Sequence, residues 1–293
     1  MLLLTAIIWG GGFVAQSAGM DYIGPFTFSA GRDLLGFVAL VPVLLLLGES
    51  HGRGLLGHFR VDRVTAWGGL FCGLMLGIAD TLQQVGLTLT TASKASFLTS
   101  LYLVFVPLLG LFVGHRLRRM LAFCLVLAMA GFYFLCLTDG LSLSPGDLLE
   151  LLCAVFFALH ILVIDHFLQK KADSVKLSWL QFLTAFCFSG VLVACFETPT
   201  AESLWAARVP LFYCGFISSG IGYTLQVVGQ KYTDPTLATL IMSLESVFGA
   251  LLGVLLLGDV LTGREVFGCV LIFVAAVLAQ IPLPALLTRL RSR

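Results

Sequence analysis

The sequence predicts an all-α membrane protein with ten transmembrane helices, arranged as two five-helix repeats of inverted topology. Three observations lead to this fold class: the composition, ten long apolar stretches, and an internal repeat. Of the 293 residues, 59% are apolar and only 11% are charged, and the mean hydropathy is +1.02. Soluble domains contain about 25% charged residues. The composition therefore argues against a soluble globular enzyme.

Ten apolar stretches are predicted to be transmembrane helices, because each has about the 20 residues that a helix needs to cross a bilayer. The long unbroken apolar runs within them differ from the alternating pattern of a membrane β-barrel. The first stretch has no basic segment before it, so we expect a retained helix rather than a signal peptide, with a few further residues preceding it. The stretches lie near residues 2–18, 25–47, 65–87, 92–113, 119–138, 147–167, 176–196, 209–230, 235–257 and 263–285.

The basic residues predict the orientation in the membrane. Thirteen of the 17 Lys and Arg residues fall on the face that carries both termini, and the opposite face receives Lys94, Arg208 and Arg264. The positive-inside rule therefore predicts cytoplasmic N- and C-termini in a multi-pass protein of the cell inner membrane. We expect Lys94, near the end of a span, to extend its amine to the membrane surface. The net charge of +1 gives no reason to expect a nucleic-acid partner.

The cysteines and the known cofactor motifs indicate no metal or cofactor. All eight cysteines lie in apolar runs without a CxxC pair, so we interpret them as small buried apolar residues. The phosphate-binding GxxxxGK[ST] motif does not occur, and neither do the HExxH, GxSxG and GxGD motifs of enzymes. Transport driven directly by ATP and intramembrane catalysis are therefore disfavoured.

An internal repeat divides the chain into residues 1–140 and 141–293. The hexapeptide TLQQVG at 81–86 recurs as TLQVVG at 224–229, a shift of 143, and scattered identities continue for about 24 further residues. Each half then holds five spans, and this odd number means that the second half enters the membrane from the opposite side. Inverted repeats are typical of secondary transporters, whose substrate site lies near the midplane between the halves.

Several motifs carry a resemblance to a known family. They are Trp9-Gly10-Gly11, Arg32, the repeated hexapeptide, SLESVF at 243–248, and LLGD at 256–259, where the family usually has Gly-Glu. On these motifs the whole chain resembles the EamA-type branch of the drug/metabolite transporter superfamily. The resemblance implies a ten-helix bacterial inner-membrane permease, similar to the aromatic amino-acid exporters, that exports amino acids or other small metabolites.

Charged side chains within the spans are the first candidates for substrate binding, because they are costly in a bilayer and tend to face a wet interior. Glu245 lies about 15 Å deep, near the midplane. It could bind a substrate amino group, carry a proton, or serve as a protonated packing residue. Arg32 and Asp80 lie at similar depths. Arg32 could therefore bind a substrate carboxylate, or pair permanently with Asp80 or Asp33.

Uncharged polar residues complete the predicted site. One face of the eighth span carries a polar stripe of Ser219, Tyr223, Gln226 and Gln230, which serves either a polar solute or contacts between helices. One face of the sixth span carries Glu150, Cys153, Phe157 and His160, and His160 could relay protons or remain a neutral imidazole. By the repeat, Tyr102 is equivalent to Glu245. The predicted substrate-binding residues are Gln16, Arg32, Asp80, Gln83, Gln84, Tyr102, His160, Tyr223, Gln226 and Glu245.

We therefore expect a permease that moves a small amphiphilic metabolite by alternating access, with no cofactor. One chain holds both repeats, so a monomer could suffice. The alternatives are proton-coupled efflux of drug-like, nucleoside-like or vitamin-like compounds, and an intramembrane enzyme or scaffold. Uniport down a substrate gradient and proton antiport through Glu245 or His160 both fit the sequence.

Overall fold

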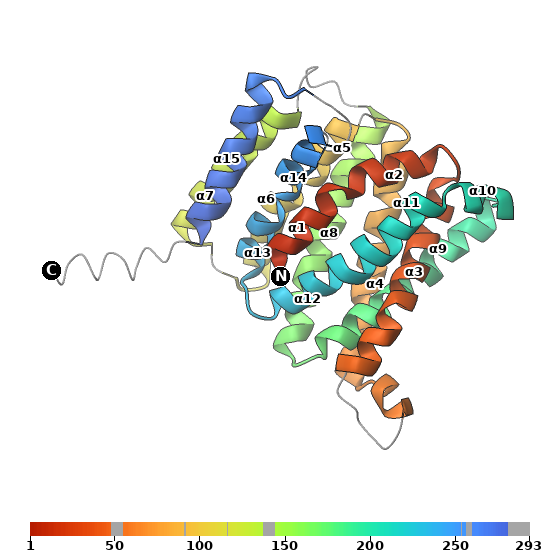
Figure 1. Cartoon of the computed structure of the whole chain (residues 1–293). Coiled ribbons are helices and arrows are strands. Elements are labelled where there is room, and N and C mark those ends of the chain that lie inside the picture. The colour runs from red at the N-terminus through yellow and green to blue at the C-terminus, as the bar shows by residue number, and fades with distance from the viewer. Residues whose placement is uncertain are drawn as a thin grey trace.

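The computed structural model describes residues 1–47, 55–90, 92–115, 117–136, 144–252, 254–255 and 260–280, and over these residues the regular structure is helical (Figure 1). Eight helical segments are long and apolar enough to cross a membrane, and they coincide with eight of the ten predicted spans. They are Leu2–Met20, Pro25–Leu46, Arg63–Leu87, Ala95–Phe112, Pro145–Gln169, Ser174–Phe196, Arg208–Gln230 and Pro235–Leu252.

Several of these spans consist of consecutive shorter helices. In chain order the elements are α1 (Leu2–Gly10), α2 (Gly12–Met20), α3 (Pro25–Leu47), the 3-10 helix η1 (Leu55–Phe59), α4 (Arg63–Leu87), α5 (Ala92–Thr99), α6 (Tyr102–Phe112), α7 (Arg119–Cys136), α8 (Pro145–Gln169), α9 (Ser174–Phe196), α10 (Ala201–Ala206), α11 (Arg208–Phe212), the π-helix η2 (Tyr213–Tyr223), α12 (Thr224–Gln230), α13 (Pro235–Met242), α14 (Glu245–Leu252) and α15 (Gly263–Ala279).

Two of the helix breaks occur at equivalent positions of the repeat. The break between α5 and α6 consists of Ser100 and Leu101, and the break between α13 and α14 consists of Ser243 and Leu244, 143 residues later. Each serine hydroxyl donates a hydrogen bond to the carbonyl three residues earlier, at 2.6 Å for Ser100 and 2.8 Å for Ser243. Such local bonds compete with regular helical bonding. The breaks place Tyr102 and Glu245 at the first positions of α6 and α14.

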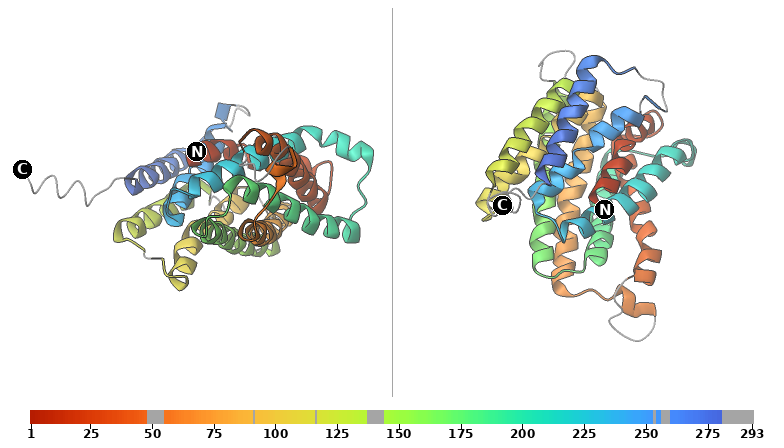
Figure 2. Two further views of the ribbon diagram at one scale, coloured as in Figure 1. Left: turned by 90° about the horizontal axis from the view of Figure 1, so that it is seen from below. Right: turned by 60° about the vertical axis from the view of Figure 1, so that its left-hand side comes forward.

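Helices from the two halves of the chain pack against each other. The helix α4 packs against α8 and α9, and α3 packs against α9 and η2 (Figures 1 and 2). Gly69, Gly73 and Gly77 on α4 let α9 approach closely. A Cβ atom on Gly73 would lie 2.4 Å from the carbonyl oxygen of Gln181, so this small-residue face holds the two halves together.

The helices α7 and α15 lie in the predicted fifth and tenth spans. They pack side by side at one edge of the molecule (Figures 1 and 2). Because α7 and α15 are not among the eight segments above, the number of ten spans remains a prediction. The side chain of Lys94, the LLGD motif at 256–259 and the C-terminal residues 281–293 lie outside the described residues.

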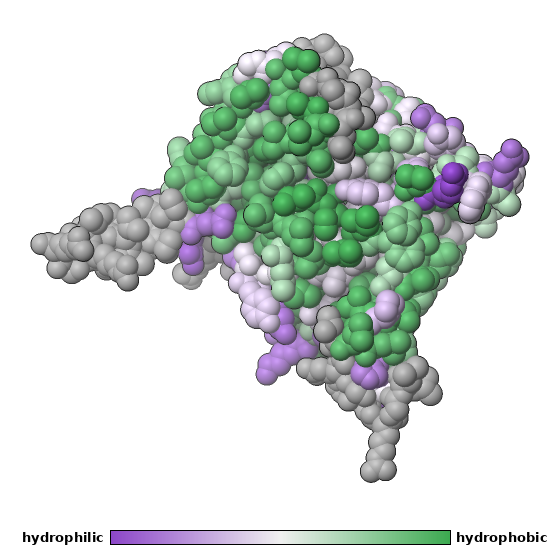
Figure 3. All heavy atoms as spheres, viewed as in Figure 1, coloured by the Kyte–Doolittle hydropathy of each residue, from purple (hydrophilic) through white to green (hydrophobic). Residues whose placement is uncertain are grey.

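Apolar side chains are distributed as in a protein embedded in lipid. They cover much of the surface seen in Figure 3, and Phe112, Val126 and Leu255 are 88%, 71% and 77% exposed. In contrast, Asp80 and Glu150 are fully buried. This distribution, apolar on the outside and polar inside, is expected for transmembrane helices that surround a water-accessible centre.

Candidate functional site

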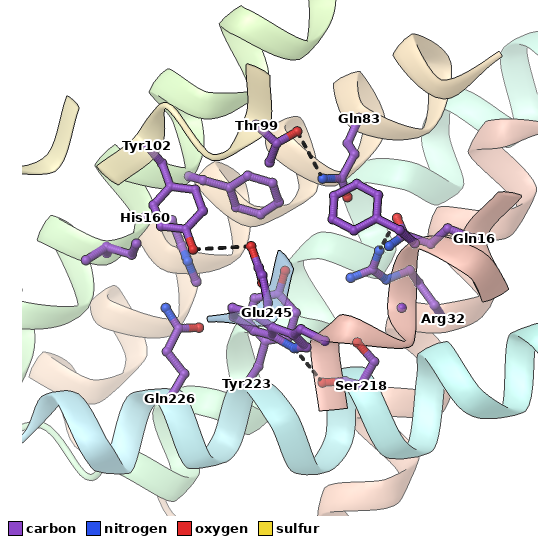
Figure 4. Close-up of a pocket in the computed structure, with 15 residues that line it drawn as sticks. Gln16, Arg32, Gln83, Thr99, Tyr102, His160, Ser218, Tyr223, Gln226 and Glu245 are labelled. Carbon is purple, nitrogen blue, oxygen red and sulfur yellow. Dashed lines mark hydrogen bonds between the residues drawn. The ribbon is translucent and has the colours of Figure 1, made fainter. Parts of the chain in front are cut away.

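A pocket lies at the centre of the helical bundle, where the broken helices meet (Figure 4). Its enclosed volume is about 50 Å³, and about 540 Å³ when the space towards its open mouth is counted. Eight of the ten predicted residues line it: Gln16, Arg32, Gln83, Tyr102, His160, Tyr223, Gln226 and Glu245. The structure thus brings together residues from α2, α3, α4, α6, α8, η2, α12 and α14.

Glu245 and Tyr102 face each other across the pocket. The Tyr102 hydroxyl donates a hydrogen bond to Oε1 of Glu245 at 3.3 Å (Figure 4). Glu245 is 7% exposed, and no cationic side chain of the described residues forms an ion pair with it. A carboxyl group in this position suits a cationic group of a bound molecule, or a proton.

Arg32 is both paired and part of the pocket wall. Its Nη2 atom lies 3.4 Å from Oδ2 of Asp80, and its Nη1 atom donates to Oε1 of Gln16 at 3.4 Å. Asp80 itself does not line the pocket, and its Oδ1 atom accepts a hydrogen bond from Tyr223 at 3.4 Å. Asp80 therefore forms its ion pair with the guanidinium group from outside the pocket lining. The Nε atom of Arg32 is buried and has no hydrogen-bond partner, so the guanidinium keeps unused donor capacity.

His160 is anchored by a neighbouring amide. Its Nε2 atom lies 3.0 Å from Oε1 of Gln181 on α9. With the amide in this orientation, Nε2 carries a hydrogen and donates it to Gln181. The Nδ1 atom is buried without a partner. In the neutral form of the ring, Nδ1 is a free hydrogen-bond acceptor, and in the protonated form it is a free donor.

An aromatic wall covers one side of the pocket. The rings of Trp9 and Tyr223 lie 4.6 Å apart between centroids, and Phe13 and Phe157 also line the cavity. The indole N–H of Trp9 donates to the carbonyl of Ser218 in η2 at 3.3 Å. The wide turns of π-helices often occur at functional sites, and here η2 supplies both Ser218 and Tyr223.

Some of the predicted amide side chains line the pocket, and others contact neighbouring helices. Gln83 and Gln226 line the pocket, whereas the Nε2 atom of Gln84 faces the sulfur of Met20 at 3.3 Å. Gln230, from the predicted polar stripe, donates to the carbonyl of Ile161 at 3.3 Å and does not itself line the pocket. The residues that sequence reasoning did not select include Trp9, Phe13, Thr99 and Ser218. The aromatic ones carried no periodicity that distinguishes them from packing residues.

The described residues contain no group of three or more His, Cys, Asp or Glu side chains arranged to hold a metal ion. The chemistry of the pocket is therefore described by hydrogen bonds, the charges of Arg32 and Glu245, and aromatic surface. Groups of these kinds can bind and orient a small solute.

Comparisons with known proteins identify a family of transporters. The profile of the EamA-like transporter family matches residues 1–137 and again residues 144–280. An uncharacterized transporter of Archaeoglobus fulgidus is 30% identical over 282 residues, covering 96% of this chain and 84% of the relative. A second uncharacterized transporter of that organism is 25% identical over 259 residues, covering 86% of each chain. A protein of known crystal structure shares the fold, with a TM-score of 0.73 and 22% identity over 95% of both chains.

Proposed function

Because this chain belongs to the EamA-like transporter family and is a multi-pass inner-membrane protein, we propose that its central pocket is the substrate site of a secondary transporter for small zwitterionic metabolites. Amino acids with aromatic or large apolar side chains are the proposed substrates, and export is the proposed direction. The observation that carries this proposal is that Arg32 and Glu245 line the same pocket, together with amide, hydroxyl and aromatic side chains.

Each end of a zwitterion finds a complementary group. The substrate carboxylate would bind Arg32 through its unused donor capacity, and the ammonium group would bind Glu245. Hydrogen bonds between ionised partners are about twice as strong as neutral ones. The rings of Trp9, Tyr223 and Phe157 would pack against the substrate side chain. Gln83 and Gln226 add hydrogen bonds without fixed charge.

We further propose the ten-span, inverted 5+5 arrangement with cytoplasmic termini as the basis of alternating access. The equivalent breaks at Ser100 and Ser243 support it, as does the packing of helices from one half on the other. Broken helices at the midplane, between inverted repeats, are the usual site of substrate binding in secondary transporters. The pocket is complete within one chain, which is compatible with a monomeric transporter.

The proposal is tested by release from preloaded proteoliposomes. Purified protein is reconstituted in vesicles loaded with labelled phenylalanine or leucine, and release is compared with that from protein-free vesicles, without an ion gradient. Glu245→Gln and Arg32→Ala should each slow release about tenfold or more. Each removes the charge that would face a charged end of the substrate, and hydrogen bonds to charged groups contribute about 1.5–3 kcal/mol. Gln84→Leu, next to Gln83 but outside the pocket, is the matched control.

Wild-type release in both pocket variants would refute the assignment of the site. Absence of release from vesicles that contain folded protein, with and without an imposed pH step, would refute amino acids as substrates.

The second candidate is proton-coupled efflux of drug-like, nucleoside-like or vitamin-like compounds. It is favoured by the excess of buried acidic over buried basic side chains among the described residues, which are Asp33, Asp80, Asp147, Glu150, Asp165 and Glu245 against Arg32 and Lys176. The same vesicles loaded with a neutral aromatic compound or a nucleoside test it.

A further inference from the structure

We propose that Glu150 is a proton-binding residue of this transporter, and that Thr99 and Gln83 transmit its protonation state to the pocket. The inference rests on the proposed function of the pocket, but the proton site itself can be tested without a substrate. Glu150 lies on α8, outside the pocket wall, and its side chain takes no part in the substrate binding described above.

A continuous chain of hydrogen bonds joins Glu150 to the pocket. The Thr99 hydroxyl donates to Oε2 of Glu150 at 2.7 Å, and Nε2 of Gln83 donates to the same hydroxyl at 3.5 Å. Both Thr99 and Gln83 line the pocket, and Figure 4 shows the bond between them. Glu150 is therefore separated from the substrate space by one hydroxyl group.

The surroundings of Glu150 provide no counter-charge among the described residues. The charged or titratable groups that face it are Asp147, one turn earlier on α8, and Cys153, one turn later. Towards α4 it meets Gly86, where an added Cβ would lie 2.5 Å from Oε1, and towards α5 it meets Thr99. The Oε1 atom is buried and has no hydrogen-bond partner.

A fully buried carboxylate with one donor and no cation is costly inside a membrane. A proton on Glu150 removes this cost, since the neutral acid needs only one acceptor. Asp147 lies at the start of α8, where it caps the helix together with Ser144, and Glu150 lies one turn further along. The pocket, which Thr99 and Gln83 line, is the side from which a proton would reach Glu150.

Protonation of Glu150 would change which group of the Gln83 amide, the carbonyl or the NH₂, faces the pocket. When Glu150 is ionised, Thr99 must donate to it, so Thr99 accepts from the Gln83 amide nitrogen and the Gln83 carbonyl is left for the pocket. When Glu150 is protonated, its hydroxyl donates to Thr99. The Thr99 hydrogen is then free for the Gln83 carbonyl, and a rotated Gln83 presents its NH₂ group instead. Both amide orientations have the same shape, so the switch needs no rearrangement of the backbone.

This change at Gln83 would couple proton binding at Glu150 to solute binding in the pocket. A pocket that presents an amide donor favours a solute acceptor such as a carboxylate, and one that presents a carbonyl favours a donor such as an ammonium group. Proton uptake from water at Glu150 would therefore change the affinity for the solute, and by reciprocity solute binding would change the affinity for the proton.

Infrared spectroscopy of the purified protein in lipid tests the proton site directly. Spectra are recorded above about pH 6, where exposed carboxyl groups are ionised, and the band of protonated carboxyl groups is compared between variants. Glu150→Gln should remove one component of this band. Thr99→Val should shift that component, because it loses the hydroxyl partner, and Thr99→Ser should restore it. Glu202→Gln, an exposed carboxyl on α10, is the matched control and should leave the band unchanged.

An identical band in wild type and Glu150→Gln would overturn the proposal, and so would a component insensitive to Thr99→Val. If Glu150→Gln does not fold, the Thr99 pair alone decides between these outcomes. In vesicles that release phenylalanine, the release rate of the wild-type protein should depend on pH. The release rate of the Glu150→Gln variant should not. Unchanged pH dependence would refute the coupling. Failure of release in wild type would refute the proposed substrate and leave the infrared test in force.

Discussion

Tyr102 and Glu245 are equivalent positions of the two halves, 143 residues apart, and they contact each other directly through a 3.3 Å hydrogen bond. Tyr223 and Asp80, also 143 residues apart, form a second pair of this kind at 3.4 Å. A residue can contact its own equivalent only near the axis that relates the two halves. Both pairs are therefore what the proposed two-fold axis between the halves would produce. Each pair combines a hydroxyl with a carboxyl group, so the two halves contribute different chemical groups.

A double-mutant cycle should detect the Tyr102–Glu245 bond. Tyr102→Phe and Glu245→Leu, which each remove one partner of the bond, are expected to be non-additive in the free energy of unfolding by about 0.5–1.5 kcal/mol, as for hydrogen bonds between membrane helices. Unfolding in detergent measures it. Tyr102→Phe combined with Glu202→Gln, which is exposed on α10, serves as the additive reference. Additivity in both cycles would mean that the bond contributes nothing to stability.

The contact between α7 and α15 depends on two glycines. A Cβ atom on Gly131 would lie 2.8 Å from the carbonyl oxygen of Gly268 and 2.7 Å from Cγ1 of Ile272. Gly131→Ala should therefore force the helices apart and destabilise the fold by about 1–3 kcal/mol. Gly190→Ala on α9, where an added Cβ meets nothing within 4 Å, should be neutral or stabilising by up to about 1 kcal/mol. Thermal unfolding that ranks the two variants equally would contradict this account.

Glu197 fixes the start of α3 from the end of α9. Its carboxylate accepts hydrogen bonds from the N–H groups of Phe26 at 3.0 Å and Thr27 at 2.8 Å, and from the Thr27 hydroxyl at 2.5 Å. Glu197→Ala should lower the free energy of unfolding by about 1–2 kcal/mol, as for the loss of a strong helix cap. Glu202→Ala, five residues later and exposed, should change it little. Equal effects would show that the cap is not formed in the membrane.

Asp62 caps α4 outside the membrane and should make stability depend on pH. Burial alone would raise its pKa, but hydrogen bonds from the Thr65 hydroxyl and from the N–H groups of Thr65 and Val64 outweigh burial, so the pKa of Asp62 is lowered. The unfolded state then binds the proton more readily. The stabilisation is present above the usual pKa of Asp, about 3.9, and is lost as the pH falls through the lowered value.

The comparison of wild type with Asp62→Asn isolates this contribution. Asparagine keeps the side-chain oxygen that caps the helix but does not titrate in this range. The difference in unfolding temperature between the two proteins should shrink as the pH is lowered through the acidic range. A constant difference would show that Asp62 titrates alike in the folded and unfolded states.

The sequence by itself determined the membrane-embedded helical fold, because composition and the length of apolar stretches depend only on the chain and the thickness of a bilayer. It also determined the internal repeat, and it selected Glu245, Arg32 and Tyr223 as polar groups too costly to leave in lipid. Eight of the ten predicted spans are helices long and apolar enough to cross a membrane, and eight of the ten predicted binding residues line one pocket.

Only the tertiary structure decided how those groups are used. Periodicity places a residue on a helix face but does not say which helix it meets, so the sequence could not separate Gln83, in the pocket, from Gln84, against Met20. It left Arg32 as either a substrate ligand or an ion-pair partner, whereas packing makes it a pocket residue held by Asp80. The contacts of Glu150 with Thr99 and Gly86 join segments more than 50 residues apart. Such contacts arise when helices pack, and no local pattern encodes them.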